Sequence, residues 1–287
     1  MAETTTLTVT PSGAACGASV RGVDLSQPLA DDLIAELRAH WLTHKVLAFP
    51  GQRLSDKDLE RFSAYFGEPG EDPFFESIAG HEHVCAIQRA ADETTPIFAE
   101  FFHSDWSFMD VPPAATALYS ITIPPQGGDT LFADQVAAYA GLSPEMRERV
   151  DGMTAIHSAE LGYAPDGVYG DGDQEQGRSM AIRPSEKARE TREHPLVTTH
   201  RETGERALFS SLAYIKSIVG MTKDESDALL MELYAHQSNE AFLYRHRWEE
   251  NMLVMWDNRS LLHAATGGYD GYDRLLHRTT IADTFGR

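Results

Sequence analysis

The feature that most constrains the fold is a pair of short motifs near opposite ends of the chain. The first is Phe102-His103-Ser104-Asp105-Trp106, and the second runs from Trp256 to His263. On an extended segment His103 and Asp105 would project from the same face, because side chains alternate along a strand. With His263 as a third metal ligand, the fold must bring distant strands together. A jelly-roll barrel does this.

Two imidazoles and one carboxylate on one side of an ion form the facial triad of non-haem Fe(II) oxygenases, which leaves coordination positions open. A His-x-Asp tripeptide alone is weak evidence, because it also occurs as an ordinary structural pair. Two further features strengthen the case. Arg274 follows His263 closely, and Gly127-Gly128-Asp129-Thr130 follows the first pair.

Taken in order along the chain, these segments resemble the Fe(II)/2-oxoglutarate dioxygenases related to taurine dioxygenase and 2,4-dichlorophenoxyacetate dioxygenase. The resemblance covers nearly the whole chain. It rests on Gly22 to Leu25, His44 to Gln52, Phe66-Gly67, the His103/Asp105 pair, Gly127 to Thr130, Trp256 to Arg259, His263, Arg274 and His277-Arg278.

The resemblance implies roles for individual residues. His103, Asp105 and His263 would hold Fe(II), which 2-oxoglutarate would chelate while leaving one position for O2. Arg274 would bind the far carboxylate of 2-oxoglutarate, because a guanidinium group offers a carboxylate two parallel hydrogen bonds. Thr130 would add a hydroxyl hydrogen bond to the same carboxylate. The implied reaction is hydroxylation of an unactivated C–H bond, with release of succinate and CO2.

The substrate is less well defined. Arg278 matches a second family arginine that helps to bind the sulfonate in taurine dioxygenase, which favours a small anionic substrate. Gly70 falls where that enzyme has a sulfonate-binding histidine, and Ala99 where it has a pocket asparagine, so taurine itself is not expected. Aromatic residues that could line a more apolar pocket, or equally belong to the core, are Trp106, Tyr163, Phe209 and Tyr214.

Two other functions remain open at this stage. One is an oxygenase of the same family that cleaves an alkylsulfate or an aryloxyalkanoate after hydroxylating the adjacent carbon. The other, from a different class, is a non-oxidative metal-binding barrel that acts as a sensor or as a hydrolase. Arg274 and Thr130 favour the oxygenases, because a hydrolase has no use for a second dicarboxylate site.

Composition limits the class of protein further. A chain of 287 residues with 42% hydrophobic residues can bury one large core, so we expect a single domain over 1–287. A net charge of −20 disfavours nucleic-acid and membrane partners. Cys16 and Cys85 are too few for a disulfide framework, and Met1 to Thr6 resemble no targeting segment. We therefore expect a cytoplasmic enzyme with a small-molecule substrate; the family also includes dimers and tetramers.

The periodicity predicts a mainly β fold with flanking helices and a jelly-roll core. Helix starts are indicated at Pro28, Ser55, Ser143 and Thr222. Strands are expected at 7–25, 45–49, 83–88, 115–123, 195–199, 207–211, 252–256 and 275–281. The segment at about 164–193 is dense in Gly and Asp, so it predicts a mobile insertion that buries little, either a lid or a solvated loop.

Overall fold

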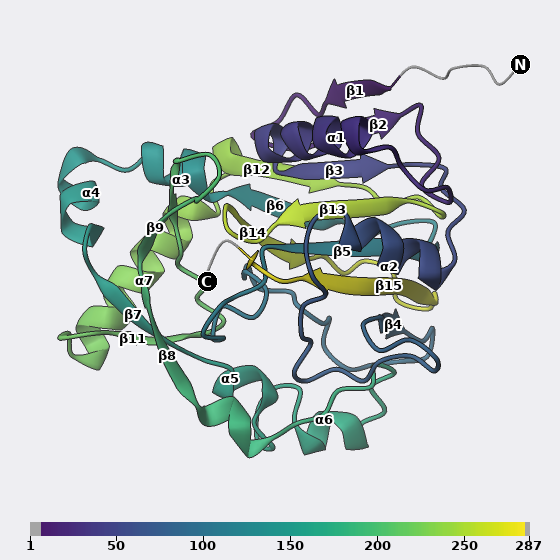
Figure 1. Ribbon diagram of the computed structural model, residues 1–287. Coiled ribbons are helices and arrows are strands. Elements are labelled where there is room, and N and C mark those ends of the chain that lie inside the picture. Colours follow the sequence, from purple (N-terminus) through teal and green to yellow (C-terminus); the bar gives the residue numbers. More distant parts are fainter. Residues whose placement is uncertain (1–6, 285–287) are drawn as a thin grey trace, which may run out of the picture.

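A seven-stranded sheet is the largest element of the computed structural model, which describes residues 7–284 (Figure 1). Its strands pair antiparallel except for the β2–β3 pair, which is parallel. In spatial order they are β1 (Thr8–Pro11), β2 (Ala18–Arg21), β3 (Val46–Phe49), β13 (Leu253–Asp257), β5 (Ala115–Thr122), β15 (Arg274–Ile281) and β4 (Cys85–Arg89).

A smaller sheet packs against the inner face of this one. It consists of β12 (Leu243–His246), β6 (Thr130–Asp134) and β14 (Leu261–Ala265). Phe132 of β6 and Leu261 of β14 share a buried cluster with Val254 and Trp256 of the large sheet. The predicted architecture, mainly β with a jelly-roll core and flanking helices, is confirmed.

Helices α1 (Asp31–His44) and α2 (Asp56–Ala64) cover the outer face of the large sheet (Figure 1). Strand β13 shows why both faces are buried. Leu253 and Met255 pack with the helices, whereas Val254 and Trp256 point between the sheets. Because side chains alternate along a strand, a strand covered on both sides reads as a continuous apolar run.

The remaining elements form a lobe at one end of the sheets (Figure 1). One three-stranded sheet and one hairpin belong to it: β7 (Thr154–Ser158), β8 (Thr191–Pro195), β11 (Ile215–Ile218), β9 (Val197–Thr199) and β10 (Arg206–Leu208). Its helical segments are α3 (Gln135–Ala140), α4 (Pro144–Val150), α5 (Glu160–Tyr163), α6 (Asp171–Glu175), η1 (Glu186–Arg189), α7 (Lys223–Gln237) and η2 (Glu240–Phe242).

Three of the predicted helix starts, at Ser55, Ser143 and Thr222, are confirmed with the expected side-chain caps, whereas the helix predicted to start at Pro28 begins at Asp31 and has no side-chain cap. Ser55 and Thr222 form reciprocal capping boxes with Asp58 and Glu225, and the Ser143 hydroxyl accepts a hydrogen bond from the Met146 amide. These caps satisfy amide groups that the first helical turn leaves without partners.

The segment at 164–193 buries more than its composition predicted. Met180, Ile182 and Ala188 are buried with aromatic residues in one cluster. Arg178 is also buried and pairs with Asp173. The expectation of low burial was wrong, because these few apolar and paired charged residues anchor a segment that is polar on average. Its mobility and its function as a lid remain predictions.

Two expectations concern the termini and membranes. The absence of a targeting segment was predicted from Met1 to Thr6, which lie outside the described residues. Within residues 7–284, none of the helices has the length and apolar character needed to cross a bilayer.

The packing of α1 on the sheet gives a first testable prediction. Leu37 is fully buried there, whereas the neighbouring Glu36 is exposed. Leu37→Ala should lower the free energy of unfolding by about 2–5 kcal/mol, because it leaves a cavity, while Glu36→Ala should change it by at most about 0.5 kcal/mol. Denaturant titration measures both; equal effects would show that α1 does not pack as described.

Candidate active site

The site is built on a backbone bridge between two distant histidines. The amide of His103 donates to the carbonyl of His263 at 3.0 Å, and the amide of His263 donates back at 2.8 Å. His263 lies in β14, and His103 lies in the irregular segment that precedes β5. The bridge therefore fixes the two imidazoles side by side, with ring centroids 4.2 Å apart.

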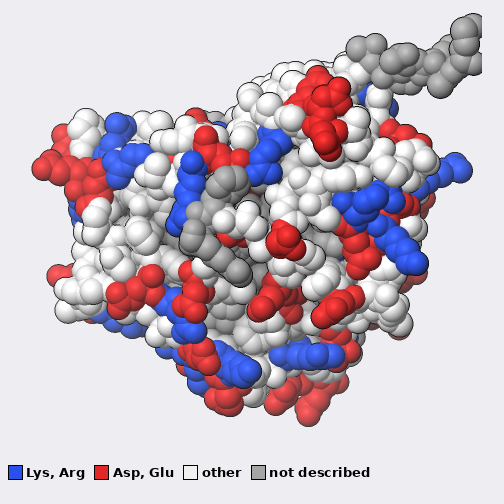
Figure 2. All heavy atoms as spheres, viewed as in Figure 1, with Lys and Arg blue, Asp and Glu red and all other residues white. Residues whose placement is uncertain are grey.

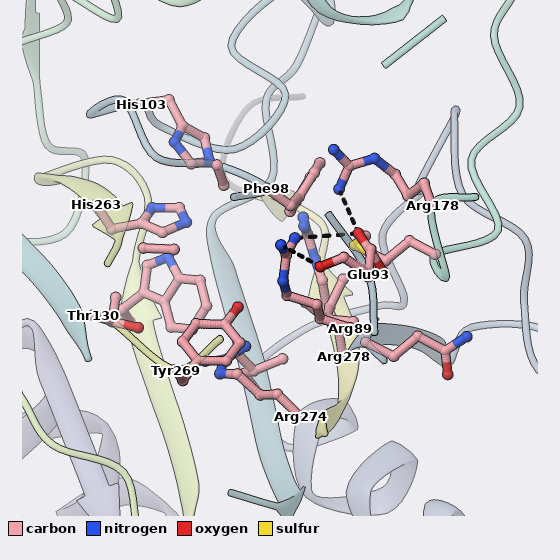
Figure 3. A pocket seen from close by; sticks show the side chains of 17 residues that line it. Arg89, Glu93, Phe98, His103, Thr130, Arg178, His263, Tyr269, Arg274 and Arg278 are labelled. Atoms are coloured by element: carbon pink, nitrogen blue, oxygen red, sulfur yellow. Dashed lines mark hydrogen bonds and ion pairs between the residues drawn. The ribbon is translucent and has the colours of Figure 1, made fainter. Parts of the chain in front are cut away.

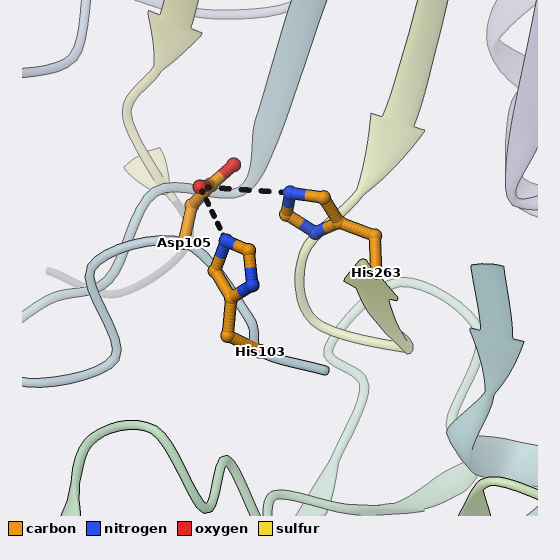
Figure 4. A group of neighbouring side chains, drawn as sticks. All are labelled: His103, Asp105 and His263. Carbon is orange, nitrogen blue, oxygen red and sulfur yellow. Dashed lines mark ion pairs between the residues drawn. The ribbon is translucent and has the colours of Figure 1, made fainter. Parts of the chain in front are cut away.

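Asp105 completes a buried cluster with the two histidines (Figure 4). Its Oδ1 atom lies 3.8 Å from Nε2 of His103 and 3.9 Å from Nε2 of His263. One ligand atom from each residue lies within 4.8 Å of the others, and this is the sole such group among residues 7–284. The structure thus brings together the three predicted metal ligands.

The local geometry differs from the expected strand. His103 makes a single bridge, after which the chain turns, and Trp106 adopts a positive φ of 48°. Asp105 therefore reaches the histidines through a turn rather than through strand alternation. The prediction that Asp105 lies beside His103 is therefore confirmed, but the predicted cause, an extended strand, was wrong.

Hydrogen bonds orient two of the three side chains. Nδ1 of His103 donates to the carbonyl of Phe101 at 2.9 Å, which leaves the Nε2 lone pair free. The Thr116 hydroxyl donates to Oδ2 of Asp105 at 2.6 Å, and the Asn258 amide donates to Thr116 at 3.0 Å. Asn258 thus positions Thr116, and Thr116 holds Oδ2 of Asp105. The other oxygen of Asp105, Oδ1, is directed at the histidines.

Burial and neighbouring charges set the protonation states. Burial, followed by the effect of His103, lowers the pKa of His263 to about 3, and burial also lowers the pKa of His103. Burial alone would raise the pKa of Asp105, but Arg278 and then the two histidines lower it to about 2. At neutral pH the cluster therefore offers two neutral imidazoles and one carboxylate.

Arg274 lies in a small cavity beside the cluster of His103, Asp105 and His263 (Figure 3). The cavity has a volume of about 70 Å³ and is also lined by His103, His263 and Thr130. Arg274 is 8% exposed, its Nε atom has no hydrogen-bond partner, and Nη2 donates only a long 3.4 Å bond to the Gly128 carbonyl. Burial lowers its pKa, as expected for a buried charge without a carboxylate partner.

Thr130 faces the same cavity from β6. Its hydroxyl oxygen accepts a hydrogen bond from the Trp248 indole at 3.0 Å, so its own proton is available for another acceptor. A buried guanidinium and a hydroxyl donor in one cavity fit a carboxylate.

The second predicted arginine, Arg278, has a different environment. Its Nη2 atom lies 3.2 Å from Oδ1 of Asp105 and 3.2 Å from Oδ1 of Asp72, without hydrogen-bond geometry at either contact. The guanidinium group also stacks on the rings of Trp106 and Phe75, at 5.0 and 5.4 Å. Arg278 is therefore enclosed on several sides.

A second cavity of about 280 Å³ opens next to the first. Phe98, Ala99 and His103 line both cavities, and the predicted Tyr163 and Tyr214 line the larger one. Tyr169 also lines it, and its hydroxyl oxygen accepts a hydrogen bond from the Ala99 amide at 3.0 Å. The larger cavity thus leads to His103, one of the two clustered histidines.

Three predicted pocket residues lie elsewhere. A Cβ atom on Gly70 would lie 2.8 Å from Oγ1 of Thr280, and Gly70 lines a different hollow on the surface. Phe209 stacks on His157, with ring centroids 5.3 Å apart, away from both cavities. Trp106 is fully buried and donates to Asp72 at 2.7 Å rather than lining a cavity. All three residues therefore take part in packing outside the two cavities.

Sequence reasoning missed several residues that the structure places in or around the site. Asp72 and Thr116 act through contacts with distant residues, and no local motif marks them. Phe98 and Tyr169 belong to irregular segments whose course the sequence left undetermined. The density of aromatic residues around His103 was the available signal.

The donor set fits a divalent ion and an organic dicarboxylate. A separation of 3.8–3.9 Å between ligand atoms can be spanned by an ion with bonds of about 2.0–2.2 Å. The uncompensated charge of Arg274 fits an anionic group that the ion's cosubstrate would supply. Fold and site together define the class of jelly-roll proteins with a buried 2-His-1-carboxylate cluster.

Comparison with known proteins identifies the family. Residues 8–280 match the model described as taurine catabolism dioxygenase TauD, TfdA family. The chain is 33% identical to the alpha-ketoglutarate-dependent sulfate ester dioxygenase of Pseudomonas putida, covering 96% of this chain and 89% of that one. It is 32% identical to the alpha-ketoglutarate-dependent 2,4-dichlorophenoxyacetate dioxygenase of Cupriavidus pinatubonensis, covering 93% and 94%.

The solved structures agree with this assignment. A taurine dioxygenase from Burkholderia xenovorans superimposes with a TM-score of 0.79 at 34% identity, covering 98% of this chain and 94% of that one. The chain belongs to the TauD/TfdA family and is a 2-oxoglutarate-dependent dioxygenase. As a member of this family it uses Fe(II), 2-oxoglutarate and O2.

The bond from Thr116 to Asp105 gives a second prediction. Thr116→Val keeps the shape of the side chain but removes the hydroxyl that orients the carboxylate, so Fe(II) affinity should fall by about 10–100-fold. Anaerobic Fe(II) titration measures this, with Thr122→Val on the same strand as the control. An unchanged affinity in Thr116→Val would show that the hydroxyl does not orient a metal ligand.

Proposed function

We propose that His103, Asp105 and His263 hold Fe(II), and that Arg274 and Thr130 bind the far carboxylate of 2-oxoglutarate. The observation that carries this assignment is the buried, carboxylate-free guanidinium of Arg274 in a cavity shared with both histidines. A buried charge without a partner is costly, so it points to a ligand of opposite charge.

The bound iron with 2-oxoglutarate and O2 supplies the oxidising chemistry for cleavage of a C–H bond. The protein's own residues position that chemistry. Thr116 holds the Asp105 carboxylate, and Phe101 holds the His103 ring, so the ligand atoms stay directed at one point. Arg274 and Thr130 would orient the cosubstrate, and the buried walls of the site would keep water away.

The substrate is proposed to be a small organic molecule with an apolar part that occupies the larger cavity. The names of relatives, a sulfate ester dioxygenase and a 2,4-dichlorophenoxyacetate dioxygenase, support an organic anion. They also support the variant in which hydroxylation next to a heteroatom cleaves a sulfate or an aryloxyalkanoate. Where the charge of such a substrate would lie depends on Arg278 and is taken up below.

We further propose one domain over the whole chain, with the segment at 164–193 acting as a lid. Tyr169, from this segment, lines the larger cavity, which supports a role in covering the substrate. On the face in Figure 2, Lys and Arg side chains lie among Asp and Glu side chains. This distribution and the net charge of −20 favour a small-molecule substrate over nucleic acid or a membrane. The low cysteine count is consistent with a cytoplasmic location. A homodimer or homotetramer is compatible with the family.

The formation of succinate from 2-oxoglutarate tests the function. Protein with Fe(II) should release succinate under air when supplied with a panel of alkyl sulfates, sulfonates and aryloxyalkanoates, and Asp105→Ala should release none above background. The absence of succinate across the panel, with Fe(II) bound in a fully folded protein, would instead favour a non-oxidative metal-binding barrel.

Arg274 provides a third prediction. Arg274→Gln removes the charged fork, so the 2-oxoglutarate concentration needed for half-maximal turnover should rise by about a hundredfold, which corresponds to roughly 2–3 kcal/mol for a charge-assisted pair. Arg183→Gln, at an exposed ion pair with Glu76, is the control. If Arg274→Gln needs the same 2-oxoglutarate concentration as the wild type, another residue binds the far carboxylate of 2-oxoglutarate.

A further inference from the structure

The arginines around the metal-ligand cluster differ in whether a carboxylate compensates them. Arg89 and Arg178 line the small cavity, but both are compensated: Glu93 lies 3.3 Å from Arg89 and 3.7 Å from Arg178, and Asp173 also pairs with Arg178. Arg274 has no carboxylate partner among the described residues and is assigned to 2-oxoglutarate under the proposed function. Arg278 is then the remaining cation that could meet the substrate.

Asp72 compensates Arg278. Its Oδ1 atom lies 3.2 Å from Nη2 of Arg278 and accepts from the Trp106 indole at 2.7 Å, while Oδ2 accepts from the Thr280 hydroxyl at 3.2 Å. The side chain of Asp72 is 7% exposed. These contacts hold the Asp72 carboxylate against the guanidinium of Arg278.

The larger cavity is suited to an apolar occupant. Among the described residues that line it, none is Lys or Arg, and the one charged residue is the acidic Glu100. Three of its lining residues, Phe101, Leu161 and Val168, are large apolar side chains that are 66%, 65% and 51% exposed. Exposed apolar groups that gather at one opening indicate a binding site for apolar surface.

The charges at the site already balance without a charged substrate. A divalent ion and Arg274 offset Asp105 and the two carboxylates of 2-oxoglutarate, and Asp72 offsets Arg278. A further anion beside the metal would be buried without compensation, which costs several kcal/mol unless a partner is found. Binding such an anion would require Asp72 to give up Arg278.

We propose that Asp72 is a specificity-determining residue that cancels the charge of Arg278, so that the part of the substrate reaching the metal is an uncharged alkyl or aryl group. An ionised group on the substrate would lie toward the mouth of the larger cavity or outside it, which favours hydroxylation remote from that group over the variant that cleaves a sulfate or an aryloxyalkanoate. This inference rests on the proposed function, and it gives Arg278 a different role from that of a sulfonate-binding arginine.

Asp72→Asn tests the proposal, because it removes the charge and keeps the size of the side chain. The probes are octyl sulfate and 1-octanol, titrated calorimetrically into anaerobic protein loaded with Fe(II) and 2-oxoglutarate. The wild type should bind 1-octanol at least as tightly as octyl sulfate. In Asp72→Asn the affinity for octyl sulfate should rise by about 10–100-fold as Arg278 becomes available, with 1-octanol changed by less than about threefold.

The control for net charge is Glu76→Gln, an exposed residue paired with Arg183, which should leave both affinities unchanged. If octyl sulfate binds the wild type more than about tenfold tighter than 1-octanol, or if Asp72→Asn does not tighten it, the proposal is overturned.

A double variant keeps the proposal testable if Asp72→Asn does not fold. Asp72→Asn combined with Arg278→Gln removes both charges together, and both probes should bind as they do to the wild type. A loss of more than about tenfold for octyl sulfate alone would show that Arg278 does bind the anion. The affinity for 2-oxoglutarate is measured in every protein: its absence in the wild type would refute the proposed function, whereas its presence with the opposite probe selectivity would refute only the role of Asp72.

Discussion

The two backbone hydrogen bonds between His103 and His263 are the constraint on which the site depends. They tie an irregular segment before the large sheet to a strand of the small sheet, so the backbones of the two histidines cannot separate without breaking these bonds. The turn that follows His103 then brings Asp105 into the cluster. Because the cluster is buried, its geometry is held by the same packing that stabilises the jelly roll.

Two arginines on one strand show how neighbours decide the role of a charged residue. Arg274 and Arg278 are both buried on β15. Arg274 has only a weak bond to a carbonyl, so it carries a charge that a ligand must compensate. Arg278 lies between two carboxylates and against aromatic rings, so its charge is already compensated. The cost of the first buried charge would be recovered when the cosubstrate binds, since the ligand then supplies the missing partner.

The order of the motifs along the chain, through the family resemblance, predicted the fold class and the three clustered residues. The capping boxes predicted helix starts, because a cap depends only on residues close together in the sequence. It also identified Arg274 and Thr130, which the structure places in one cavity. It could not predict Asp72 or Thr116, whose importance comes from contacts with residues far along the chain. Gly70, Phe209 and Trp106 were predicted to line the pocket but lie elsewhere. Neither correspondence with a family residue nor aromatic character shows which cavity a residue faces. The buried part of 164–193 was missed because average composition hides a few anchoring residues.

A crystal structure of the protein grown without oxygen, with Fe(II) and 2-oxoglutarate, tests the central claim most directly. The account predicts one iron ion bound by His103, Asp105 and His263, and 2-oxoglutarate extending from that ion to the guanidinium of Arg274. Iron at another position, or a cosubstrate whose far carboxylate lies away from Arg274, would contradict it.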